Sequence, residues 1–155
     1  MHNIPESDDL RKMGIDISNE FSRIEGRQPR ILVANSSENT SFSTNSLSNI
    51  LADMGFDVDI APRLNTFKNL ANQCIENDAD ILLICNNSQH FNIELSKIEQ
   101  HLNSKNFYNI LAIYLQDKDM TNSFVSKLKN WKIYDQTYNE ESIAFDLIQI
   151  LMNAS

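Results

Sequence analysis

Residues 26–35 read GRQPRILVAN and residues 52–62 read ADMGFDVDIAP, and these two stretches decide the expected fold. Each carries a short apolar run bounded by polar or turn residues, which is typical of a strand. Between the two runs, apolar residues recur at helical spacing at Leu47, Ile50, Leu51 and Met54. Gly55 follows, where a helix commonly ends in a left-handed residue. The segment therefore predicts a strand, a helix and a second strand.

The same alternation continues toward the C-terminus. Helical apolar stripes are expected over residues 67–75, 95–102, 124–128 and 143–151, and strands over residues 79–84, 110–115 and 131–134. Parallel strands need crossover connections, and those connections are right-handed. The sequence therefore predicts an α/β fold. It is a flavodoxin-like (Rossmann-like) open five-stranded parallel sheet in the order 2-1-3-4-5, with helices on both faces.

Residues 1–29 precede this alternation and are expected to form an N-terminal linker or helix, leaving residues 30–155 as the α/β domain. An apolar stripe at near-helical spacing, interrupted by Gly14, comprises Leu10, Met13, Ile17, Phe21 and Ile24. A stripe on a leading helix needs something to cover it. The helix either packs onto its own domain or docks onto a partner, and the sequence leaves both interpretations open.

Composition narrows the class of protein. The net charge of −8 and pI near 4.7 disfavour nucleic acid and anionic membranes as partners, because both need clustered Lys and Arg. The acidic start MHNIPESDDL is unlike a targeting peptide, so a cytoplasmic protein is expected. Cys74 and Cys85 have no metal-ligand spacing and are expected to be buried free thiols.

Glycine is scarce, with three in the whole chain. Backbone amides that cradle a phosphate need a tight turn and close approach, which usually demand glycine. The dinucleotide-binding and P-loop motifs are both absent, which disfavours a Rossmann oxidoreductase or a nucleotide triphosphatase. The acidic pairs Asp57/Asp59 and Asp78/Asp80 flank strands on the expected amino side of the sheet, where a solvated edge is the expectation.

The two quoted stretches resemble the C-terminal cobalamin-binding domain of methylmalonyl-CoA mutase, most specifically in RQPRILVA and ADMGFDVDIAP. The resemblance extends from about residue 26 to residue 80, is weaker to His90 and fades through the C-terminal third. In that family the domain follows a substrate-binding barrel within a longer chain. The resemblance implies the same α/β fold and directs attention to three ligand-binding elements.

The first element of the family is Asp-x-His-x-x-Gly, whose histidine coordinates cobalt and whose aspartate orients that histidine. The corresponding stretch here is SSENTSFSTNS, which contains neither histidine nor glycine. The flanking frame places the histidine position at Thr40 or Ser41, the aspartate near Glu38 and the glycine near Ser43 or Thr44. A hydroxyl does not replace imidazole as a ligand to cobalt.

The second element is a Ser-x-Leu motif after the third strand, and its positions here are Cys85, Asn86 and Asn87. The third is a Gly-Gly pair after the fourth strand, which leaves room for the nucleotide tail of cobalamin. Leu115 and Gln116 stand there instead. Because all three elements have changed together, the resemblance implies a degenerate site, and we expect no catalytic residue, no metal and no bound cofactor.

His90 keeps a family position, because NNSQHFN aligns with a segment that ends in Ala-Gly-His. In the family this histidine lies on the upper face and is not the lower cobalt ligand. It is interpreted either as a retained contact with a barrel or as an ordinary loop histidine.

The expected function is that of a degenerate domain of a mutase small subunit. Such a domain would form a heterodimer with a cobalamin-carrying large subunit, and would be a non-catalytic component of an isomerase. Two ligand-binding alternatives remain: a module that still binds a corrinoid without the histidine, or one that holds a flavin phosphate through the loop hydroxyls. An unrelated adaptor that reuses the fold is the third possibility.

Overall fold

The computed structural model describes residues 6–35, 44–61, 67–86, 91–107, 111–116, 131–134 and 139–154. The helices are α1 (Ser7–Glu25), α2 (Thr44–Asp53), α3 (Phe67–Glu76), α4 (Phe91–Ser104) and α5 (Glu140–Ala154). The strands are β1 (Arg30–Asn35), β2 (Asp57–Ile60), β3 (Ile81–Asn86), β4 (Leu111–Gln116) and β5 (Trp131–Tyr134). The short helix expected over residues 124–128 lies outside the described residues. No helix within the described residues is long and apolar enough to cross a membrane.

The strands form one sheet in the order β2-β1-β3-β4-β5, and each neighbouring pair is parallel. The α/β class and the parallel sheet expected from the sequence are confirmed. Residues 81–84 of β3 are fully buried, because β3 lies inside the sheet and is covered on both faces.

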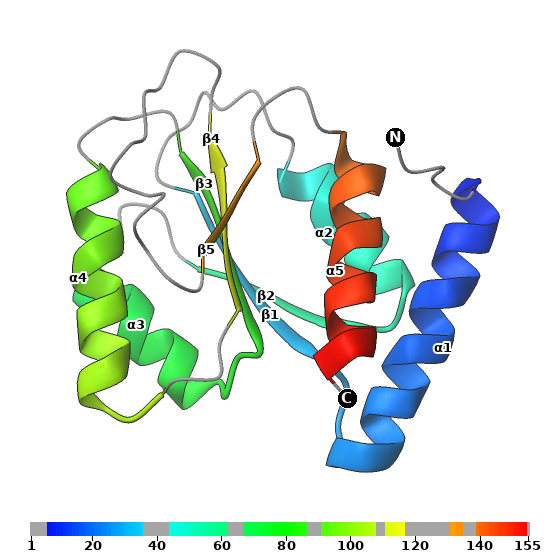
Figure 1. The fold of residues 1–155 in the computed structure, drawn as a ribbon, viewed down its shortest axis with the longest axis horizontal. Coiled ribbons are helices and arrows are strands. Elements are labelled where there is room, and N and C mark those ends of the chain that lie inside the picture. Colours follow the sequence, from blue (N-terminus) through cyan, green and yellow to red (C-terminus); the bar gives the residue numbers. More distant parts are fainter. Residues whose placement is uncertain are drawn as a thin grey trace.

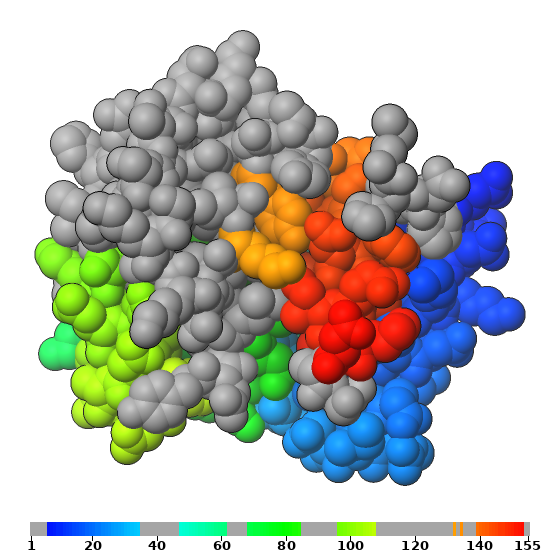
Figure 2. Space-filling view, viewed as in Figure 1, coloured from blue at the N-terminus to red at the C-terminus, as the bar shows by residue number. Residues whose placement is uncertain are grey.

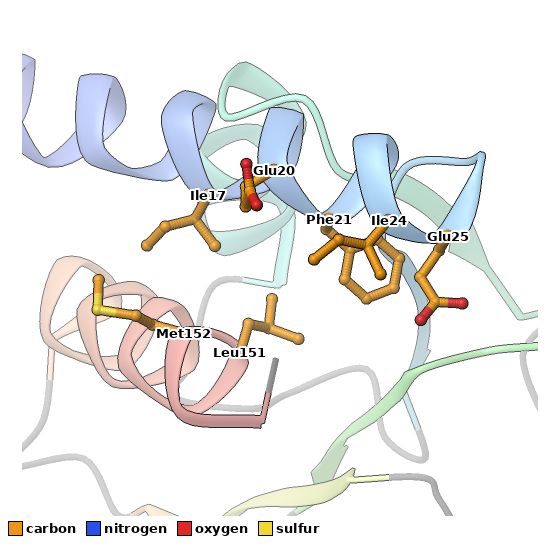
Figure 3. A pocket seen from close by; sticks show the side chains of 7 residues that line it. All are labelled: Ile17, Glu20, Phe21, Ile24, Glu25, Leu151 and Met152. Atoms are coloured by element: carbon orange, nitrogen blue, oxygen red, sulfur yellow. The ribbon is translucent and has the colours of Figure 1, made fainter.

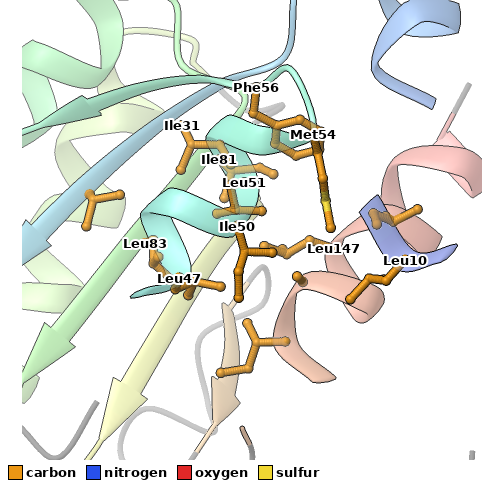
Figure 4. Packing of buried hydrophobic residues seen from close by; sticks show 14 of the residues in the cluster. Leu10, Ile31, Leu47, Ile50, Leu51, Met54, Phe56, Ile81, Leu83 and Leu147 are labelled. Carbon is orange, nitrogen blue, oxygen red and sulfur yellow. The ribbon is translucent and has the colours of Figure 1, made fainter. Parts of the chain in front are cut away.

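Helices cover the sheet on both faces (Figure 1). Successive residues of β1 alternate between two hydrophobic clusters, as the two-residue period of a strand requires. Ile31 and Val33 join a cluster with α1, α2 and α5, whereas Leu32 and Ala34 join one with α3 and α4. Figure 4 shows the first cluster. The sheet is thus the middle layer, and its two faces have separate cores.

Helix α1 lies outside α2 and α5 on the first face (Figure 1). Its buried residues, Leu10, Gly14 and Ser18, are four apart and therefore share one side of the helix. A Cβ added at Gly14 would lie 2.4 Å from Met54 Sδ, so the glycine permits the close approach of α1 to the end of α2. Of the two interpretations left open for the leading helix, the structure shows packing onto its own domain.

Ser18, one turn after Gly14 on α1, also contacts the turn after α2. Its hydroxyl lies 3.2 Å from the Gly55 carbonyl oxygen and also within hydrogen-bond distance of the Gln28 side-chain oxygen. Gly55 has φ of +88°, the left-handed conformation expected for the residue that ends α2. The contact therefore ties α1, the turn after α2 and the segment leading into β1 together.

Candidate functional site

The carboxyl ends of β1, β3 and β4 lie side by side at one edge of the sheet (Figure 1). The register pairs Asn35 with Cys85, Cys85 with Leu115, and Asn86 with Gln116. The backbone positions of the second and third family elements are therefore neighbours, and the segment that holds the first element leaves from the same edge. This edge is where open parallel α/β sheets bind their ligands.

Several expected site residues lie outside the described residues: Glu38, Thr40, Ser41, Ser43, Asn87 and His90. Thr44 is the first residue of α2. The structure thus brings Cys85, Leu115 and Gln116 together through their backbones.

In the family that the chain resembles, the lower cobalt ligand is a histidine in the segment after the first strand. The sequence holds no histidine between residues 35 and 44. His101, the one histidine among the described residues, lies near the end of α4, and its Nε2 is 2.8 Å from Asn72 Oδ1 of α3. Figure 1 shows α4 running back from the carboxyl edge, so the last turn of α4, which contains His101, is at the end away from that edge. Within the described residues, no group of three His, Cys, Asp or Glu side chains could hold a metal ion.

At the amino edge of the sheet, Arg27 and Asp80 form a two-point ion pair. Arg27 Nη1 lies 2.7 Å from Asp80 Oδ2, and Nη2 lies 3.0 Å from Oδ1. The backbone N–H of Arg30 also donates to Asp80 Oδ2, at 2.8 Å. The hydrogen bond to Asp80 raises the pKa of the Arg27 guanidinium. A bidentate, charge-assisted pair of this kind is stronger and more directional than a simple contact between charges.

The other acidic residues of this edge are more exposed. Asp57 and Asp78 have about 60% of their side chains exposed, at 60% and 63%, and they lie 3.6–4.0 Å from Arg27 or Arg30. The expectation of a solvated edge describes these two residues. It is wrong for Asp80, which is 22% exposed and serves as the partner of Arg27. Sequence spacing gave no signal for this pair, because 53 positions separate the two residues.

Cys74 is a buried free thiol, as expected. Burial raises its pKa to about 12, so the group stays protonated and is a poor nucleophile near neutral pH. Cys85 lies next to the last residue of β3.

A groove of about 290 Å³ lies between the second half of α1 and the end of α5 (Figure 3). It is lined by Ile17, Glu20, Phe21, Ile24, Glu25, Leu151 and Met152. The sequence identified the α1 stripe but not the contribution of α5. A second, polar hollow of about 430 Å³ lies between α1, α2 and the start of α5, and Arg11, Glu140 and Glu141 are among its lining residues.

No protein-family model matches the chain. Parts of it are similar to methylmalonyl-CoA mutase large subunits. It is 33% identical over 81 residues to the subunit of Propionibacterium freudenreichii subsp. shermanii. This match covers 52% of the present chain and 11% of the Propionibacterium subunit. It is 38% identical over 63 residues to the subunit of Streptomyces virginiae, covering 40% and 9%. The chain spans about a tenth of the length of these relatives.

The fold is also that of a known structure. A novel cobalamin-binding protein from Desulfitobacterium hafniense DCB-2 matches with a TM-score of 0.61 over 93% of this chain and 70% of that chain, at 11% identity. At that identity the match establishes a shared fold. The resemblance read from the sequence is thus supported by similarity to mutase chains and by the fold of a cobalamin-binding protein.

Proposed function

We propose that this chain is a degenerate domain of the cobalamin-binding type, which pairs with a mutase-related protein and carries no cofactor of its own. The observation that carries the proposal is the register at the carboxyl edge. It brings Asn35, Cys85 and Leu115 together, at strand ends followed by segments in which the family's ligand-binding residues have been replaced.

The chemistry of the replacements supports the absence of cobalamin. Thr40 and Ser41, the positions expected for the histidine, carry hydroxyls in place of an imidazole. Leu115 and Gln116 carry side chains where the family pattern has none. The first replacement removes the cobalt ligand, and the second fills the space for the nucleotide tail. Restoring the histidine alone would therefore leave the tail without space, and restoring the glycines alone would leave cobalt without its ligand.

The partner we propose is a cobalamin-carrying large mutase subunit, with this chain in the position of a small subunit in a cytoplasmic heterodimer. The similarity to mutase large subunits supports a mutase-related partner, because paired subunits of one enzyme commonly share a fold. In this role the chain has no catalytic residue and serves as a structural subunit of an isomerase. His90 is the candidate for a retained contact with that partner.

A second candidate function is that of a small-ligand module, which would bind a corrinoid without a histidine or a flavin phosphate through hydroxyls. The fold match to a cobalamin-binding protein favours it. Helix α2 also begins at Thr44, within the hydroxyl-rich segment SSENTSFSTNS, and helix N-termini attract phosphate groups.

The test is an absorbance titration of the purified chain with adenosylcobalamin, hydroxocobalamin and flavin mononucleotide, followed by calorimetry. We expect no spectral change and no heat. A mutase large-subunit domain with an intact Asp-x-His-x-x-Gly motif is the positive control. Tight corrinoid binding would overturn the cofactor-free role, and binding of the flavin alone would favour the phosphate alternative.

The partner is tested separately, by sedimentation of the chain with a cobalamin-loaded mutase large subunit. We expect a one-to-one complex. Independent sedimentation of the two proteins at micromolar concentration would contradict the heterodimer, whatever the titration shows.

A further inference from the structure

We propose that the groove between the C-terminal ends of α1 and α5 is a docking site for a basic amphipathic helix of a partner protein. This inference goes beyond the proposed function. It concerns a surface built from α1 and α5, whereas the proposed loss of cobalamin concerns the carboxyl ends of the strands. Either proposal can fail without the other.

The floor of the groove is apolar and accessible. Ile17, Phe21 and Ile24 reach into it from α1, and Leu151 and Met152 reach into it from α5 (Figure 3). The exposed fractions are 53% for Ile24 and 45% for Met152, which makes them two of the four large hydrophobic residues exposed among the described ones. Covering such side chains is favourable by about 25 cal/mol per Å² of apolar surface removed from water.

The position of the groove between two helices suits the side chains of a protein partner. Figure 2 shows α5 and α1 side by side at the surface, so the groove between them is flanked by two helices. A third helix can lay its ridge of side chains between two packed helices, as helices do in protein cores. A row of apolar residues on one helix face is therefore the matching shape.

The electrostatics select a basic partner. Helices α1 and α5 run in the same direction and both end at the groove, so the negative ends of two helix dipoles lie beside it (Figure 1). Glu20 and Glu25 line the groove. Arg23 pairs with Glu20, so Glu25 and the two helix ends supply the negative charge, and α5 carries no basic residue. Lys or Arg beside the apolar row of the partner would complement these charges.

The same charges disfavour other occupants. A symmetric contact with a second copy of this chain would bring Glu25 and the two helix ends against their own equivalents, and like charges held together are destabilising. An anionic membrane or a nucleic acid would meet the same repulsion. A basic helix is the partner that satisfies both the apolar floor and the acidic surroundings.

One wall of the groove is held in place before any partner binds. The Arg27 guanidinium lies 5.5 Å from the centroid of the Phe21 ring, within the range of a cation–π contact. Arg27 is itself fixed by its two hydrogen bonds to Asp80. The Phe21 ring is therefore oriented by the fold, and such preorganisation reduces the entropy lost on binding.

The experiment uses the full chain with methyl-labelled Ile and Met and a synthetic amphipathic helix that has Leu on one face and Lys on the other. We expect the methyl signals of Ile24 and Met152 to shift, while those of Ile15 and Ile60, exposed elsewhere, stay in place. The same peptide with Glu in place of Lys should bind at least tenfold more weakly. Added salt should weaken binding of the Lys peptide.

Variants separate the groove from the rest of α1. Ile24→Lys and Glu25→Lys should each weaken binding of the Lys peptide at least tenfold, and Met152→Ala should weaken it to a smaller extent. The matched controls Ile15→Lys and Asp16→Lys make the same changes on exposed positions of α1 outside the groove, and should stay within twofold of the parent. Thermal melting of each variant checks that it is folded.

Three results would overturn the proposal. Equal binding of the Lys and Glu peptides would remove the charge argument, and equal losses in the Ile15 and Ile24 variants would indicate nonspecific adhesion. Shifts of the Ile24 and Met152 methyls that depend on protein concentration without peptide, together with a dimer by sedimentation, would assign the groove to a second copy of the chain. The cobalamin titration is read independently of all three.

Discussion

The two edges of the sheet differ in what their residues do. At the amino edge, Asp80 holds both the Arg27 side chain and the Arg30 backbone, and Ser18 and Gly55 join α1 to α2. At the carboxyl edge Cys85 and Leu115 are neighbours, and we propose that this edge has lost the ligand-binding residues of the family that the chain resembles. The amino edge is held by side-chain contacts, whereas the carboxyl edge is described by the strand register that brings Asn35, Cys85 and Leu115 together.

This difference explains why the resemblance lies where it does. The two stretches that carry it contain β1 and β2, which pair with each other from Arg30 and Asp57 to Val33 and Ile60. The Asp57 N–H also donates to the Pro29 carbonyl oxygen at 2.8 Å. The recognisable frame is therefore a single structural unit, and its sequence is constrained by packing even when no ligand is bound.

The largest effect at the amino edge is expected for Asp80→Ala. This change leaves the Arg27 guanidinium and the Arg30 N–H without their acceptor, and hydrogen bonds to charged groups contribute about 1.5–3 kcal/mol. We expect the free energy of unfolding to fall by about 2–3 kcal/mol in urea titrations. The matched control is Asp57→Ala, an exposed residue of the same edge expected to cost less than about 0.5 kcal/mol. Equal losses for the two variants would show that the edge is held by diffuse charge.

Gly14→Ala is the next largest. The new methyl would lie 2.4 Å from Met54 side-chain atoms, and overpacking a core costs about 1–3 kcal/mol. Higher helix propensity offsets about 0.5–1 kcal/mol of that cost, so a net loss of about 1 kcal/mol is expected. A double-mutant cycle with Met54→Ala measures the coupling. Strictly additive losses would mean that the α1–α2 contact has room for the methyl.

The buried thiol of Cys74, on α3, is expected to make the free energy of unfolding depend on pH. Above about pH 8.5 the unfolded chain loses the thiol proton, while the folded chain keeps it because its pKa is raised to about 12. The unfolded state then binds fewer protons, so the free energy of unfolding falls as pH rises, by about 1.4 kcal/mol at pH 9.5. The comparison is between the parent and Cys74→Ala, whose curve should lack this part of the decline. Parallel curves would refute the shift.

The smallest effect is expected at the carboxyl edge, for Ser41→His. The substitution supplies an imidazole but leaves Leu115 and Gln116 in place of glycines, so hydroxocobalamin should still give no spectral change. The free energy of unfolding should stay within about 0.5 kcal/mol of the parent. A cobalt–imidazole spectrum in this variant would show that a histidine at position 41 is enough to restore binding. Leu115 and Gln116 would then not block the nucleotide tail, and that part of the degenerate-site interpretation would be wrong.

Short-range patterns were enough to predict the fold class. Leu47, Ile50, Leu51 and Met54 repeat at helical spacing, and Gly55 ends that helix with a positive φ. The apolar run over residues 81–84 indicated a strand covered on both faces. These features are local, and a parallel sheet follows from their alternation.

Contacts that join distant residues were not predictable in the same way. Nothing in the sequence around Arg27 marks Asp80 as its partner. The sequence also left open whether α1 packs on its own domain, and the close contact of Gly14 with Met54 shows that it does. The candidate site is an intermediate case. The sequence placed Cys85 and Leu115 at strand ends, and the register then showed that those ends are adjacent.

The burial of Leu10 has a consequence for modularity. Helix α1 precedes the alternating units, yet Leu10 belongs to the same core as Ile31 and Leu147 (Figure 4). A gene fragment that began at Arg30 would encode every strand and still leave Met54 without the cover that Gly14 provides. The cooperative folding unit therefore includes the leading helix and is longer than the repeating βα pattern suggests.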